Sequence, residues 1–234
     1  MATSGTTSFN PSLDVAIEEA YERVGLEIRT GYQFRTARRS LNYLITELAN
    51  HGLNLWTYEE ADIPLVQGQY IYDLPDDCVD LVDQVIRQNP GSQYNQTDLV
   101  IPRIALPTYD AIPNKLAQGR PVQVWVNRQT PTPKIYLWQV PNQSGYSFHY
   151  WYLRRVQDAG TTGNTTQDVP FRFYEALTAG LAYHLARKQP ELDMNRIQLL
   201  KASYDESLQL AKDEDRDKSP VRFVPMAGRM GGGW

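Results

Sequence analysis

The chain has 234 residues, of which 41% are hydrophobic, so it is long enough for one domain or two and can form a buried core. Its formal net charge is −4 and its pI is near 5.4, with Lys and Arg scattered along the sequence. This charge argues against a protein that grips nucleic acid by bulk positive charge, because neutralising phosphates needs clustered basic side chains.

The single cysteine, Cys78, excludes an intrachain disulfide and fits assembly in a reducing compartment. Residues 1–12 are polar and rich in Ser and Thr, and they contain neither the basic segment nor the apolar segment of an export signal. No run of about 18 apolar residues follows. We therefore expect no membrane partner, and we expect residues 1–10 to be disordered or an extended arm.

Two helices are predicted near the N-terminus. Apolar residues at helical spacing predict the first over residues 13–28, with Ser12 or Asn10 as its N-cap and acidic side chains in its first turns. The second is predicted from about residue 33 to residue 50, with Gly52 at its C-terminal end.

Residues 57–157 have a different character. Helical spacing gives way to short runs of β-branched and aromatic residues, separated by turns rich in Gly, Pro, Asn and Asp. The simplest arrangement is a β-sandwich or a small β-barrel, with a short helix possible within residues 106–113. The predicted strands are residues 62–66, 69–74, 79–87, 99–104, 122–127, 134–139 and 146–155.

A helical hairpin is predicted from Asp168 to Arg216. Asp168 is the expected N-cap of its first helix, which the dipeptide Gln189-Pro190 ends. The second helix has one apolar stripe for its hairpin partner and a second apolar side that needs another surface. A neighbouring subunit is one candidate for that surface. The predicted subunit-interface residues are Leu192, Leu199 and Leu210.

The predicted fold class is α+β: a bundle of about four helices, two N-terminal and two C-terminal, with an inserted β-sandwich or small β-barrel and an extended C-terminal tail. None of these helices is long enough to be stable alone, so we expect the two pairs to close on each other. The predicted segments are an arm and helix pair over 1–56, a β-rich insert over 57–157, a linker and helical hairpin over 158–216, and a tail over 217–234.

The sequence offers little catalytic chemistry. It has no phosphate-binding Gly-rich loop, no nucleophile elbow and no Cys or His spacing typical of a metal site. His184 lies within an apolar helix face, where a core or interface histidine is the more common role. We expect no catalytic residue, no bound metal and no cofactor.

Two segments are candidates for contact with other molecules. Arg35, Arg38 and Arg39 lie three and four residues apart on one flank of the second predicted helix. They could face a DNA backbone, an acidic partner or only solvent. The tail over 217–234 has apolar residues among prolines and four glycines, a composition typical of segments that dock on another molecule.

Several motifs resemble a known family, the head-to-tail adaptor proteins of short-tailed bacteriophages, also called head completion or tail tubular protein A-type proteins. The sequence EALTAGLAYHLA over 175–186, followed by YDESL over 204–208 and AKDED over 211–215, is similar to their C-terminal helices. IPNK at 112–115, GRP at 119–121 and KIYLW at 134–138 are similar to their middle segment in order and spacing. The resemblance covers about residues 37–225, and the Gly-rich end with Trp234 has no counterpart.

The resemblance implies a non-enzymatic structural protein of the virion, at the head–tail junction. Members form a ring, usually of twelve copies, which docks beneath the portal protein and carries the tail nozzle protein, with tail fibres as a further candidate partner. Genomic DNA passes through the ring without sequence-specific contacts, and assembly takes place in the host bacterial cytoplasm. The C-terminal extension would reach the portal. Its predicted portal-binding residues are Arg222, Phe223, Val224, Met226, Arg229 and Trp234.

Two other functions stay open from the sequence. A carbohydrate-binding or cell-wall-degrading phage tail protein could use the aromatic β-rich segment as a sugar platform. It would need exposed aromatic planes and, for hydrolysis, an opposed pair of carboxylates, for which Glu59, Glu60 and Asp62 are the nearest candidates. A tail nozzle or other structural tail subunit is the third possibility.

Overall fold

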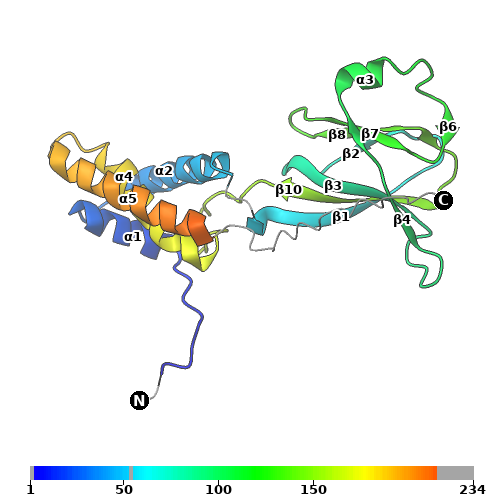
Figure 1. The fold of residues 1–234 in the computed structure, drawn as a ribbon. Coiled ribbons are helices and arrows are strands. Elements are labelled where there is room, and N and C mark those ends of the chain that lie inside the picture. Colours follow the sequence, from blue (N-terminus) through cyan, green and yellow to red (C-terminus); the bar gives the residue numbers. More distant parts are fainter. Residues whose placement is uncertain (1–2, 53–54, 215–234) are drawn as a thin grey trace, which may run out of the picture.

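The computed structural model describes residues 3–52 and 55–214 of the chain. A helical bundle forms one end of an elongated molecule and a β-region forms the other, while the N-terminal arm runs away from the bundle (Figure 1). The predicted tail over 217–234, with all six predicted portal-binding residues, lies outside the described residues.

Four helices form the bundle: α1 (Leu13–Val24), α2 (Gly31–Asn50), α4 (Tyr174–Ala186) and α5 (Met194–Glu214). Helix α4 packs against each of the other three, and side chains from all four helices share one buried core. The predicted closure of the two helix pairs into one bundle is therefore confirmed. Helix α4 can be central because nine of its residues, most of them Ala, Gly or Leu, are buried.

Local backbone conformation and capping hydrogen bonds set the end of the first helix and the start of the second. Helix α1 ends earlier than predicted because Gly25 adopts a left-handed conformation with a φ of 87°. Helix α2 begins earlier than predicted because Thr30 forms a capping box with Gln33. The Thr30 hydroxyl accepts the Gln33 backbone N–H at 3.3 Å, and the Gln33 side chain accepts the Thr30 N–H at 3.1 Å.

The N-terminus of α1 is capped by another part of the chain. Ser12 has the N-cap backbone conformation, but its hydroxyl donates to the Asp14 carboxylate rather than capping the helix. The N–H groups of Leu13 and Asp14 instead donate to the carbonyls of Thr165 and Gly163, at 2.7 Å and 2.9 Å. The linker before α4 thus satisfies the first donors of α1.

The β-region has two four-stranded sheets that pack face to face. The first has the order β1 (Tyr58–Pro64), β10 (Tyr146–Arg154), β3 (Cys78–Gln88) and β4 (Thr97–Val100), with every pair antiparallel. The second has the order β2 (Ile71–Asp73), β8 (Lys134–Trp138), β7 (Gln123–Asn127) and β5 (Arg103–Ile104), in which β5 and β7 are parallel. The small elements are the 3-10 helices η1 (Leu55–Thr57) and η2 (Phe171–Phe173), the helix α3 (Leu106–Asp110), and the strand pair β6 (Gln118–Gly119) and β9 (Val140–Pro141).

One buried core joins the two sheets. Phe148 and Ile86 contribute from the first sheet, and Val124 and Leu137 contribute from the second. The strands described form a sandwich of two sheets and not a closed barrel, so the first of the two predicted β-arrangements is the observed one. The α+β fold class is confirmed.

Candidate interaction surfaces

A partly buried ion cluster ties the sandwich to the bundle. Arg154, at the end of β10, has a side chain that is only 11% exposed. Its guanidinium donates to both carboxylate oxygens of Asp168, at 2.5 Å and 3.0 Å, and its Nε donates to Glu59 on β1 at 2.7 Å. The prediction that Asp168 caps the hairpin's first helix is wrong. Helix α4 begins at Tyr174 after η2, and the Asp168 carboxylate is held by Arg154 instead.

Asp168 makes further contacts on both sides of the junction. Its carboxylate accepts the Gln157 backbone N–H at 3.0 Å, and its carbonyl accepts the Trp56 indole N–H at 3.1 Å. Burial acts to raise the Asp168 pKa, but the hydrogen bonds from Arg154 and Gln157 outweigh it and lower the pKa below its ordinary value. These contacts fix where the chain passes from sandwich to bundle.

Acid should weaken this junction. Because the folded chain holds Asp168 at a pKa below the ordinary 3.8, the folded state binds fewer protons there than the unfolded state. The stability that this carboxylate provides is complete above its ordinary pKa and is lost as the pH falls through the lower, folded value. We expect the free energy of unfolding, measured by urea denaturation, to fall as the pH is lowered below about 4, and to fall less in Asp168→Asn. Asp158→Asn, at an exposed residue, is the control, and equal pH dependence in wild type and Asp168→Asn would contradict the assignment.

The outer face of α2 carries the three predicted basic residues, but their contacts differ. Arg38 donates to the Thr161 carbonyl at 3.2 Å and so contacts the linker. Arg35 and Arg39 are exposed and share their stripe with Tyr32 and Tyr43, each 66% exposed. The three arginines line an open hollow of about 460 Å³ with Tyr32, Thr36 and Asn42. All three arginines therefore stay candidates for contact with another molecule, and Arg35 and Arg39 are the more exposed of them.

The predicted subunit-interface leucines also separate. Leu192 precedes α5 and is partly buried against the bundle core, so its placement on the same helix as the other two is wrong. Leu199 and Leu210 lie on α5 and are 59% and 64% exposed. Large apolar side chains this exposed mark a surface that another molecule can cover.

A large hollow lies between the N-terminal arm and the bundle. It measures about 740 Å³, and Phe9, Val15 and Phe171 are among the side chains that line it. The arm is tied there by a hydrogen bond of 2.5 Å from the Tyr174 hydroxyl to the Asn10 side chain.

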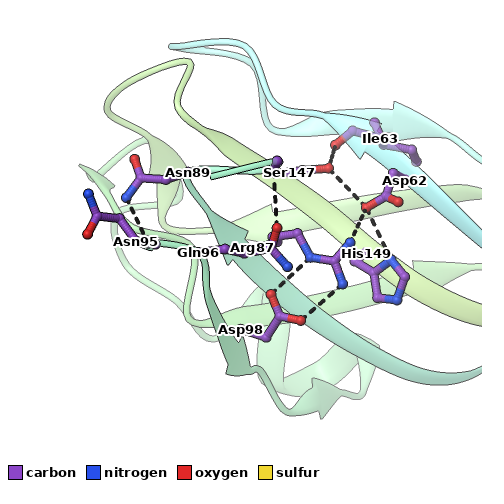
Figure 2. Close-up of polar contacts among 10 residues, drawn as sticks. Asp62, Ile63, Arg87, Asn89, Asn95, Gln96, Asp98, Ser147 and His149 are labelled. Atoms are coloured by element: carbon purple, nitrogen blue, oxygen red, sulfur yellow. Dashed lines mark hydrogen bonds and ion pairs between the residues drawn. The ribbon is translucent and has the colours of Figure 1, made fainter. Parts of the chain in front are cut away.

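A polar cluster on the outer face of the first sheet brings together serine, histidine and aspartate (Figure 2). Asp62 accepts the Ser147 hydroxyl at 3.3 Å and lies 3.1 Å from His149 Nδ1. A serine nucleophile needs the histidine between itself and the acid, whereas here Ser147 contacts the aspartate directly. Arg87 extends the cluster by pairing with Asp62 at 3.5 Å and with Asp98 at 2.9 Å and 3.0 Å. The cluster is a ladder of cross-strand pairs over β1, β10, β3 and β4.

The two other candidate reactive groups, His184 and Cys78, are largely shielded from solvent. Burial lowers the pKa of His184, against the opposing effect of Glu47, whose carboxylate lies 3.3 Å away. Burial, with nearby Asp80 and Asp77, raises the pKa of Cys78 to about 11, which disfavours a reactive thiolate. Across residues 3–52 and 55–214, no group of His, Cys, Asp and Glu side chains could hold a metal ion, and no helix has the length and apolarity to cross a membrane.

Several of the features that a sugar-binding protein would need are engaged in other contacts. Tyr109 of α3 is buried and stacks on Trp125 with ring centroids 5.3 Å apart, and it also meets Tyr136 edge-on. Glu59 and Asp62, two of the three candidate carboxylates, are paired with Arg154 and Arg87. These aromatic planes and carboxylates therefore serve the fold of the sandwich and its junction.

Comparison with known proteins gives a family and a distant likeness. The model of the SU10 adaptor protein family matches residues 17–225. A solved structure described as the neck of an empty GTA particle, computed with C6 symmetry, is a distant match with 11% sequence identity and a TM-score of 0.28. The alignment covers 83% of this chain and 92% of the chain in that structure. No curated protein gives a significant match. Because the family model spans both the bundle and the sandwich, the chain belongs to the SU10 adaptor protein family, which confirms the predicted relationship to phage head-to-tail adaptors.

Proposed function

We propose that the chain is a non-enzymatic adaptor that forms a ring between the portal protein of a phage capsid and the tail nozzle protein. The observation that carries this proposal is the match of an adaptor family model to residues 17–225. The ring, proposed to have twelve copies, would continue the DNA channel at the head–tail junction of the virion after assembly in the host bacterial cytoplasm.

The shape of the molecule supports a connecting role. The bundle and the sandwich lie at opposite ends and have separate cores, so each can present its own surface to a different partner (Figure 1). In this proposal the bundle builds the ring, and the sandwich faces the tail nozzle and possible tail fibres. The net charge of −4 suits a channel through which DNA passes, because firmly held phosphates would impede its movement.

Particles made without this protein test the proposal directly. In a phage whose gene for this chain carries a stop codon, we expect heads without attached tails and poor retention of packaged DNA. Supplying the full-length protein from a plasmid should restore tailed, infectious particles. Tailed particles of normal infectivity made in its absence, verified by mass spectrometry, would contradict an adaptor role.

The proposed portal contact of the tail gives a second prediction. A chain ending at Arg216 should fold like the full chain, because the described cores lie before that residue. We expect it to bind the purified portal at least about tenfold more weakly, since it lacks the apolar and basic residues of 217–234. Circular dichroism checks the fold and surface plasmon resonance measures the affinity. Unchanged affinity would remove the tail from the portal contact.

A further inference from the structure

The outer face of α2 carries a regular exposed stripe. Tyr32, Arg35, Arg39, Tyr43 and Thr46 follow one another at spacings of three, four, four and three residues, and all are exposed. This spacing places them along one line of a helix. The stripe, called the α2 stripe below, has two aromatic side chains with two arginines between them.

The outer face of α5 carries a stripe with the same spacing. It consists of Leu199, Ala202, Glu206, Leu210 and Asp213, all exposed. The two leucines are eleven residues apart, as are the two tyrosines of the α2 stripe, which corresponds to roughly 16 Å along each helix. The large side chains of the two stripes therefore match in position.

The charges of the two stripes are opposite. The α2 stripe has only basic charged side chains, and the α5 stripe has only acidic ones. In the described part of the chain, Arg35, Arg39 and Glu206 form no ion pair, whereas Asp213 accepts a hydrogen bond from Gln209 at 3.1 Å. The α5 lysines, Lys201 and Lys212, lie about 120–140° around the helix from the stripe, at about 100° per residue.

We propose that the α2 stripe of one copy packs against the α5 stripe of a second copy. Because the two stripes belong to different helices, the contact is heterologous, and repeating it head to tail closes a ring when the rotation allows. The inference rests on the proposed ring and names the surfaces that build it. Ring growth would cover the exposed tyrosines and leucines and would place one arginine of the α2 stripe against Glu206.

Both helix orientations satisfy the pairing. An antiparallel contact sets Arg35 against Glu206 and Arg39 against the small Ala202, while a parallel contact sets Arg39 against Glu206. In either orientation, each tyrosine of the α2 stripe lies opposite a leucine of the α5 stripe. The charges at the centre of the contact then favour this pairing over contact between two copies of the same stripe.

Charge reversal on each stripe tests the interface. Arg35→Glu with Arg39→Glu, and separately Glu206→Lys with Asp213→Lys, should each weaken assembly at least about tenfold, because like charges would then meet. Particle mass, measured by analytical ultracentrifugation alone and with the cognate portal, gives the degree of assembly. Lys201→Glu, on the other side of α5, is the matched control and should assemble like wild type.

Mixing the two charge-reversed proteins is the decisive experiment. The reversed α2 stripe of one protein then meets the reversed α5 stripe of the other, and their unchanged stripes still match, so an alternating ring should form. Failure of the mixture to assemble, or normal assembly of either reversed protein alone, would overturn the interface. Loss of DNA binding by the α2 variant, with assembly intact, would assign that stripe to DNA instead. If wild-type protein forms no ring either alone or on the portal, the proposed function fails as well.

Discussion

Replacing Gly180 with valine should lower the free energy of unfolding by about 2–3 kcal/mol. Gly180 of α4 faces side chains of both α2 and α5. A Cβ there would lie 2.8 Å from the Tyr204 ring and 2.9 Å from a methyl group of Leu44, both shorter than side chains tolerate. Urea denaturation followed by circular dichroism measures the change.

Gly31→Val is the matched control for this prediction. Gly31 is the first residue of α2, and a Cβ at this position would meet nothing within 4 Å. We expect its stability to stay within about 0.5 kcal/mol of wild type. If Gly180→Val were as stable as wild type, α4 would not be the tightly packed centre of the bundle.

Replacing Arg154 with alanine should cost about 2–4 kcal/mol of stability and loosen the link between bundle and sandwich. The substitution leaves the partly buried carboxylate of Asp168 without the guanidinium that holds both its oxygens, and it removes the contact with Glu59. Urea denaturation measures the stability. Small-angle X-ray scattering should show a broader distribution of interatomic distances as the two ends become free to move.

Two variants separate this effect from a general loss of charge. Arg155→Ala removes the next residue, whose side chain is 66% exposed and pairs with the equally exposed Asp158, so we expect a change below about 1 kcal/mol. Arg154→Lys keeps the charge but lacks the planar fork and should recover only part of the loss. Equal effects from Arg154→Ala and Arg155→Ala would contradict a special role for the partly buried ion cluster.

Local patterns were enough to predict the helices of the bundle. The apolar spacing around Leu41 and Leu44 in α2, and around Leu177 and Leu181 in α4, depends only on neighbouring residues along one helix. Since each of these stripes had to be buried, closure of the four helices followed. The helix ends shifted because Thr30 with Gln33 and the backbone of Gly25 set them.

Contacts between distant segments were not predictable in the same way. Asp168 resembles an N-cap by position, but its partner Arg154 comes from the sandwich and holds the carboxylate more strongly than the helix end could. Asp62, His149 and Arg87 meet because of strand register, which a single sequence does not specify. The arginines of α2 and the leucines of the C-terminal hairpin could be named from their spacing, but only the fold shows which of them remain exposed.

The most direct test of the adaptor account is the mass and shape of the purified protein, alone and mixed with its cognate portal. Light scattering gives the mass and electron microscopy gives the shape. We predict a closed ring with a central channel, formed by the protein alone or on the portal as a template. A persistent monomer that does not bind the portal would contradict the account.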